Sequence, residues 1–216
     1  MRTARLPLAV ALALLPAAAA RADVIVSTFG PGLGYATDSF VDVDGPAVPV
    51  GNPRAVAVPF SPLLTATVDR VELPLAKSPF GAGPGNFVVQ VRGDRSGLPG
   101  AVVEAISLGN VPALPVGVVA APSALHPLLM GGGQYWLAVV PAGPTASGLW
   151  AVADPPAAAT VALTPDLGGT WVLNEFGLSP VPAVRIFGTA VPEPSALALA
   201  GLAAAGLAWR RLRRRR

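Results

Sequence analysis

The chain has 216 residues, of which 52% are hydrophobic and only 12% are charged, and it contains no cysteine. Its formal net charge of +3 comes from the two ends, because residues 23–190 hold six basic and eleven acidic side chains. This composition excludes disulfides and thiolate metal sites, and the acidic middle lacks the basic surface that a nucleic-acid-binding domain needs.

The first 22 residues have the three parts of a secretory signal peptide. A positively charged region with Arg2 and Arg5 precedes the apolar run Leu6–Leu15. Ala20 and Ala22 then give the small-x-small pattern that signal peptidase recognises. We expect the Sec machinery to export the chain and signal peptidase to cut before Asp23. The alternative, a retained anchor, is disfavoured because the apolar run is too short for a comfortable membrane span.

Residues 23–190 form short β-type runs separated by glycine and proline. The runs are Val24–Phe29, Ser39–Val43, Arg54–Phe60, Thr67–Ala76, Asn86–Arg92, Val102–Leu108, Gln134–Val140, Leu149–Ala153, Thr160–Thr164, Thr170–Asn174 and Ala183–Gly188. None of the segments between the two ends has ten or more residues of capped helical periodicity. The pattern predicts an all-β fold, an antiparallel, jelly-roll-like β-sandwich that needs no metal or disulfide.

Two of the runs carry finer signals. The apolar side chains of Phe87–Val91 alternate, so Phe87, Val89 and Val91 should face the core together. In the run from residue 67, Val68 is out of phase with Val71. This break in alternation predicts either a β-bulge or an edge position.

A weak metal candidate lies early in the domain. Asp42 and Asp44 are two residues apart and precede Gly45. Paired carboxylates on a loop can bind Ca²⁺, but the full spacing of a calcium loop and its distal glutamate are missing. The alternative is a solvated segment that leads from a strand into a turn, and we expect no other metal and no cofactor.

The segment Asp94–Gly100 and the aromatic side chains are the candidates for ligand binding. A turn with Gly97 at positive φ and Pro99 at a corner explains the segment without a ligand. Sugar rings could stack on an aromatic platform, whose candidate members are Tyr135, Trp136, Trp150 and Trp171. Tyr135 and Trp136 must point to opposite faces of a strand, so one is expected in the core and the other at the surface.

Catalysis has little support in the sequence. His126 is the only histidine, and the G-x-S-x-G nucleophile motif does not accompany it. A carboxylate pair of the glycosidase type remains open, although scattered acids make chance pairs common. We therefore expect that the chain is not an enzyme.

The tail has three parts in a fixed order. Val191, Pro192, Glu193 and Pro194 come first, and the apolar run Ser195–Trp209 follows. An arginine cluster comes last: Arg210, Arg211, Arg213, Arg214, Arg215 and Arg216. The prolines favour an extended peptide, and the arginines mark the cytoplasmic side and stop transfer.

This arrangement closely resembles the PEP-CTERM sorting domain of exopolysaccharide-producing Gram-negative bacteria. The resemblance implies that an exosortase, an integral-membrane cysteine protease, recognises Pro192, Glu193 and Pro194 and cleaves nearby. It divides the chain into a signal peptide (1–22), an ectodomain (23–190) and a sorting tail (191–216). The alternative is an ordinary C-terminal tail anchor.

The ectodomain is similar to the choice-of-anchor domains, of which the R type is nearest. The resemblance rests on the order of Thr28–Gly32, Arg54–Phe60, Asp94–Gly100 and Gly133–Leu137. It implies an exported β-domain of unknown molecular function.

These patterns predict an inner-membrane precursor that reaches the cell surface or the extracellular matrix. We expect a structural or adhesive component associated with exopolysaccharide. The alternative is a carbohydrate-binding module that recognises the cell's exopolysaccharide. Buried tryptophans would favour the first role, and an exposed aromatic pair in a groove would favour the second.

Overall fold

The computed structural model describes residues 22–49, 54–174 and 179–191, together with Gly206 and Arg210. The described residues between 22 and 191 form an all-β body, with one short 3₁₀ turn at Pro31–Leu33 and no α-helix among them. Apart from Ala22 and Gly206, the expected signal and transmembrane helices fall on residues outside the described ranges. The all-β, antiparallel prediction is confirmed.

The described residues form fifteen strands. In chain order they are β1 (Asp23–Ser27), β2 (Tyr35–Asp44), β3 (Ala55–Phe60), β4 (Ala66–Lys77), β5 (Phe87–Arg95), β6 (Leu98–Leu108), β7 (Gly117–Pro122), β8 (Leu128–Leu129), β9 (Tyr135–Pro141), β10 (Ser147–Ala153), β11 (Ala158–Ala159), β12 (Ala162–Thr164), β13 (Val172–Leu173), β14 (Ser179–Pro180) and β15 (Arg185–Ala190). Each of the eleven predicted runs overlaps one of them. The short β8, β11 and β14 and the six-residue β7 were not predicted.

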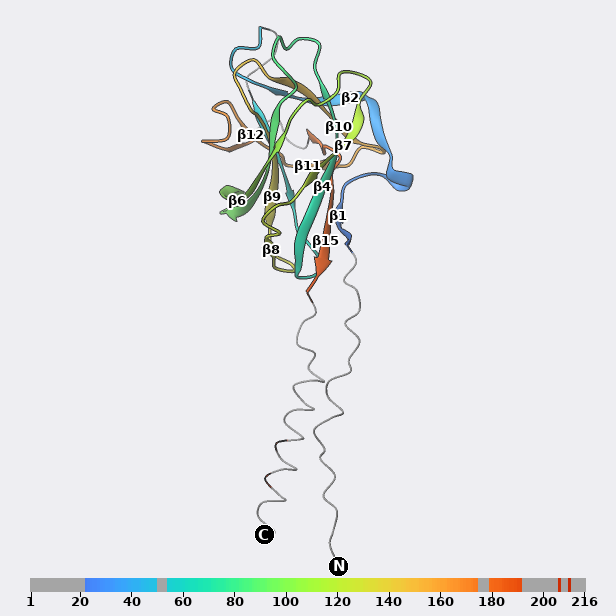
Figure 1. The fold of residues 1–216 in the computed structure, drawn as a ribbon, viewed down its shortest axis with the longest axis vertical. Helices are drawn as coiled ribbons and strands as arrows, with labels where there is room; N and C mark the ends of the chain where they lie inside the picture. The colour runs from blue at the N-terminus through green and yellow to red at the C-terminus, as the bar shows by residue number, and fades with distance from the viewer. Residues whose placement is uncertain (1–21, 50–53, 175–178, 192–205, 207–209, 211–216) are drawn as a thin grey trace, which may run out of the picture.

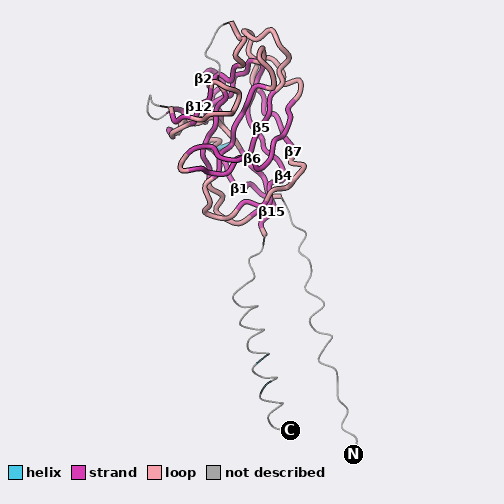
Figure 2. The backbone as a smooth tube through the Cα atoms, turned by 90° about the vertical axis from the view of Figure 1, so that its left-hand side faces the viewer, coloured by secondary structure: helices cyan, strands magenta, loops and turns pink. Residues whose placement is uncertain are grey.

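Two antiparallel sheets pack face to face. One sheet follows the order β1-β15-β4-β10-β2, and β7 and β8 also pair with β4. The other follows the order β13-β12-β3-β9-β5-β6. The strands run along the body, and most loops gather at its two ends (Figure 1; Figure 2). Neighbours within each sheet are mostly distant in the chain, so each sheet depends on pairing between segments far apart in the sequence.

A β-bulge lies in β4, where the break in alternation predicted a bulge or an edge. Gly188 of β15 pairs with Val68, while the adjacent Phe187 pairs with Arg70, which leaves Asp69 as the extra residue. The bulge turns Val68 and Val71 to the same face, and both are fully buried. Because β15 and β7 both pair with residues 70–72, they lie on opposite edges of β4, which is therefore an interior strand.

The main core fills the space between the sheets. Phe87, Val89 and Val91 of β5 are fully buried in it, which confirms their predicted face. Trp150 of β10 lies in the same cluster and donates its indole N–H to the Ala183 carbonyl at 2.9 Å. Trp150 therefore buries a large apolar surface while its indole N–H keeps a hydrogen-bond partner.

A second, smaller core covers the outer face of the six-stranded sheet. It contains Trp136 and Trp171, alanines of β3, β9 and β12, and the partly buried Leu98. Sequence alternation did not predict this cluster, because alanines on an outward face carry no strong apolar signal. The hairpin of β5 and β6 and the loop before β13 supply the cover.

Candidate functional site

The two ends of the ectodomain emerge side by side. Asp23 at the start of β1 pairs with Gly188 of β15, the strand that leads into the tail (Figure 1). Beyond β15, the Val191 N–H donates to the Thr65 carbonyl at 2.9 Å. The four-residue motif predicted from Val191 onward therefore begins at the surface of the folded body, with no spacer between them.

A polar and aromatic cluster fixes β15 onto β4. Arg185 donates to Oε2 of Glu72, and Arg70 Nε donates to Glu72 Oε1 at 2.9 Å. The Arg70 guanidinium lies 3.5 Å from the centre of the Phe187 ring. Thr189 donates its hydroxyl to Asp69 Oδ2 at 2.8 Å, so the bulge residue also holds β15. These contacts lie just before the tail and stabilise the pairing of β15, the last strand, with β4.

The Glu72 carboxylate gives the domain a pH dependence. Burial by itself raises the pKa of Glu72, but the hydrogen bonds from Arg185 and then Arg70 outweigh it and hold that pKa below its usual 4.5. A carboxyl group with a lowered folded pKa contributes stability that is fully present above its unfolded pKa and is lost as the pH falls through the folded value.

We therefore expect Glu72→Gln to lower the denaturation midpoint at neutral pH. The difference in midpoint between the wild type and this variant should shrink as the pH falls below about 4.5, because the wild-type carboxylate then becomes protonated. The measurement is urea unfolding at pH values from neutral to acidic. Asp38→Asn, at an exposed carboxylate of β2, is the matched control. A gap that stays constant with pH would contradict the proposed charge effect.

The segment after β15 carries the decisive similarity. Residues 190–215 match the family described as the PEP-CTERM protein-sorting motif. The sorting motif implies exosortase-dependent sorting to the cell surface from a membrane-anchored precursor in Gram-negative bacteria. The chain matches no curated protein.

The described residues include only part of the predicted processing sites. Val191 is exposed and hydrogen-bonded to the body, and Arg210 is exposed in helical backbone. The half-buried Ala22 and the exposed Asp23 are described at the other end. The remaining site residues lie outside the described ranges: Ala20, Pro192, Glu193, Pro194, Arg211, Arg213, Arg214, Arg215 and Arg216. Among the described residues, no helix has the length and apolar character needed to cross a membrane.

The calcium candidates already have protein partners. Asp42 Oδ2 accepts from Arg54 at 2.8 Å, and Asp44 Oδ1 accepts from the Ser147 hydroxyl at 2.6 Å. Burial raises the pKa of Asp44, and the neighbouring Asp42 adds to this effect against the Ser147 hydrogen bond. Within the described ranges, no three His, Cys, Asp or Glu side chains gather as a metal site would require. The two aspartates therefore join β2 to its neighbours.

The four aromatic candidates do not form one platform. Trp136, Trp150 and Trp171 are at most 6% exposed. Tyr135 and Trp136 point to opposite faces of β9, as their alternation predicts. Tyr135 packs against the main core and stacks on Phe60, with the ring centres 5.8 Å apart. Trp136 is buried in the second core and is the expected core member, whereas Tyr135 is half-buried and not the fully exposed side chain that was expected.

His126 belongs to a loop held by a buried carboxylate. Glu104 accepts from the Ser123 hydroxyl at 2.7 Å and from the backbone N–H groups of Ala124 and Leu125. The Ser123 oxygen also accepts from the backbone N–H of His126, whose ring contacts Asp69 at 3.3 Å. The serine hydroxyl is thus directed at Glu104 and not at the imidazole. Sequence analysis missed Glu104, although a signal was present: Glu104 alternates in phase with the buried Ile106 and Leu108 of β6, which places its carboxylate on the inward face.

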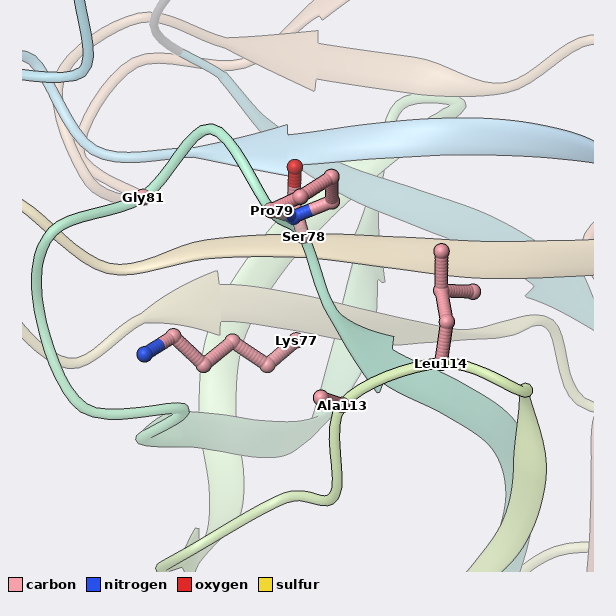
Figure 3. Close-up of a pocket in the computed structure, with 6 residues that line it drawn as sticks. All are labelled: Lys77, Ser78, Pro79, Gly81, Ala113 and Leu114. Atoms are coloured by element: carbon pink, nitrogen blue, oxygen red, sulfur yellow. The ribbon is translucent and has the colours of Figure 1, made fainter.

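Several cavities in the described part of the chain lie away from the tail, and two of them bear on ligand binding. One of about 290 Å³ is lined by Lys77, Ser78, Pro79, Gly81, Ala113 and Leu114, of which only Lys77 is charged (Figure 3). A second, of about 440 Å³, lies between the β5–β6 hairpin and the loop before β13. It is lined by Arg95, Ser96, Leu98, Pro99, Gly169, Thr170 and Trp171.

The Asp94–Gly100 segment beside the larger cavity is a tight hairpin. Arg95 pairs with Leu98, and Ser96 and Gly97 between them both have positive φ. Gly97 is thus where the sequence predicted, and two positive-φ residues are typical of a type I′ turn. Pro99 pairs with Asp94 within the ladder, so its predicted place at a turn corner is wrong.

Proposed function

We propose that this protein is a structural or adhesive component of the cell surface or extracellular matrix, associated with exopolysaccharide. In this proposal, residues 1–22 are removed on export, residues 23–190 are the working ectodomain and residues 191–216 are the sorting tail. The observation that carries it is the sorting motif, which follows directly on a strand paired on both sides, between β1 and β4. Such a domain can be released at the motif without losing any strand.

We further infer that the ectodomain works without catalysis. The partners of its acidic side chains support this. Asp42 and Glu72 pair with arginines, Glu104 caps a loop, and Asp166 accepts from the backbone N–H groups of Gly169 and Thr170. The hydroxyl of Ser123 is likewise committed to Glu104. Side chains that stabilise turns and strands in this way are poorly placed to act as an acid–base pair.

The proposal includes a relationship to the choice-of-anchor R ectodomains and a jelly-roll-like topology. Two facing antiparallel sheets whose neighbouring strands are mostly distant in sequence support the topology. The tight hairpin at Asp94–Gly100 and the buried Trp136 and Leu137 support the relationship, because they lie in the segments that carry the resemblance.

A carbohydrate-binding role is the second candidate. The cavity of about 440 Å³ supports it, because Arg95 at its wall could donate hydrogen bonds to sugar hydroxyls. The burial of the three tryptophans counts against a stacking platform and therefore favours the structural role.

Binding of the mature protein to glycans separates the two candidates. For the structural role we expect the protein to be recovered with the extracellular matrix, yet to show no saturable binding to a discrete oligosaccharide on a glycan array. The carbohydrate-binding role predicts saturable binding that Arg95→Glu weakens. Lys77→Glu, at the other cavity, is the matched control. Saturable binding lost only in Arg95→Glu would overturn the structural proposal.

A further inference from the structure

Large apolar side chains gather at the end of the body from which the tail emerges. Leu63 is 90% exposed, Leu64 is 65%, Leu128 is 52%, Met130 is 57% and Val191 is 40% exposed. We call these five residues the apolar tip. Exposed leucines are common singly, but a contiguous group usually marks an interaction surface.

Hydrogen bonds and strand pairs place the five residues together. Ala66 of β4 pairs with Leu129 on one edge and with Ala190 on the other. Thr65 accepts from Val191 through its carbonyl and from the Gly131 N–H through its hydroxyl. The loop that carries Leu63 and Leu64 is therefore bonded to both the β8 loop and the start of the tail. All of these segments lie at the β8 and β15 end of the body (Figure 1).

The surroundings of the tip suit a lipid surface. Residues 61–66 and 127–134 contain no acidic or basic side chain. His126 borders the tip and faces Asp69, whose second carboxylate oxygen accepts from Thr189. Asp23, at the start of β1, lies near Gly188 and not in the tip loops. The tip therefore presents apolar side chains with little charge to repel lipid headgroups.

The length of chain beyond Val191 fixes how far the tip can lie from the bilayer. Four residues lead from Val191 to Ser195, where the apolar run of the tail begins. At the maximum reach of about 3.6 Å per residue, this segment spans no more than about 14 Å. The headgroup layer on each side of a bilayer is about 5–8 Å thick. A tail inserted as the sorting motif requires therefore keeps Val191 no more than about 6–9 Å beyond the headgroups, within reach of them.

We propose that the apolar tip inserts its leucines and methionine into the outer face of the inner membrane while the precursor is anchored by its tail. The occupant of this surface is the lipid bilayer. This inference rests on the proposed membrane-anchored precursor. Apolar side chains buried at the level of the headgroups bind a membrane surface reversibly. Because the inserted tail tethers the domain, the tip meets the bilayer at a high effective concentration. The contact sets the orientation in which the sorting motif meets a membrane protease.

Site-specific fluorescence in vesicles tests the proposal on the full precursor. Because the chain has no cysteine, Leu64→Cys and Leu128→Cys each give one site for an environment-sensitive label. The precursor is reconstituted into vesicles of phosphatidylethanolamine and phosphatidylglycerol, with and without lipids that carry a quencher near the headgroup. We expect strong quenching and a blue-shifted emission at both positions.

Two further labels serve as matched controls. Phe80→Cys carries the label at an exposed apolar residue, 59% exposed, in the loop after the opposite end of β4. It should show little quenching. Gly206→Cys reports insertion of the tail.

Each outcome has a separate meaning. Quenching at Gly206 without quenching at Leu64 and Leu128 overturns the tip proposal and leaves the anchored precursor standing. Absence of quenching at all three positions contradicts both. Tip quenching that disappears when the protein is diluted in lipid, with energy transfer between differently labelled copies, assigns the surface to self-association and overturns the proposal. No protease is present, so docking to an exosortase cannot cause the signal.

Discussion

Replacing Pro192, Glu193 and Pro194 together with alanine is expected to leave an uncut precursor in the inner membrane. Residues 190–215 match the sorting motif, and these three residues are its predicted recognition sequence. The arginines cannot cross the bilayer cheaply, because each one costs about 2.5–3.5 kcal/mol at the centre of a helix. When cleavage is blocked, the protein should therefore stay anchored in the membrane and should not be released.

Intact mass and cell fractionation of the wild type and the triple variant measure this effect. In a host with an exosortase, the wild type should lack Ala196–Arg216, and the variant should retain it. The wild type in a host without the protease is the matched control and should behave like the variant. If the mature wild-type protein still contains the arginine cluster, the tail serves only as an anchor.

The second large effect is expected from Trp150→Ala. The Trp150 side chain is fully buried in the main core, and its indole N–H is bonded to the Ala183 carbonyl. Truncation of a buried tryptophan to alanine costs about 3–5 kcal/mol, whereas whole domains are stable by only about 5–15 kcal/mol. The variant should therefore lose a large share of the free energy of unfolding, and much of it should be degraded before sorting.

Denaturant unfolding followed by far-UV circular dichroism measures the loss for purified protein. Trp150→Phe keeps most of the apolar volume but leaves the Ala183 carbonyl without its donor, which costs about 1–3 kcal/mol. Phe80→Ala, at an exposed side chain, is the surface control and should change the free energy by less than about 0.5 kcal/mol. Equal midpoints for Trp150→Ala and wild type would show that the main core does not depend on this side chain.

Local patterns predicted the parts of the fold that depend on neighbours in the chain. Each of the eleven β-type runs overlaps a strand, and the misplaced Val68 indicated the bulge at Asp69. Side-chain alternation has a period of two residues, so the buried face of β5 could be deduced from Phe87–Val91 alone. The tight turn at Gly97 likewise needs only the local preference for positive φ.

Other features have no local signature. The β7 strand is rich in small residues, and it is fixed by pairing with β4, some fifty residues earlier in the chain. Alternation with Ile106 turns Glu104 inward, but the three donors that satisfy its buried carboxylate come from a loop about twenty residues later, which the strand does not specify. Trp136 is buried because a hairpin and a distant loop cover the outer face of its sheet. Each of these outcomes depends on partners that the segment itself does not specify.

The sequence by itself determined the class of the fold and the sorting tail. Strand periodicity and turn residues act locally, and the order of motif, apolar run and arginines is a linear signal that a membrane and a protease can recognise. Only the tertiary structure decided how that signal is presented. Pairing of β1 with β15 places both ends together, and the contacts of Thr65 gather the apolar tip around Val191. The physical reason is that burial and hydrogen bonding between distant segments are settled when the sheets pack, and not by the residues of any one strand.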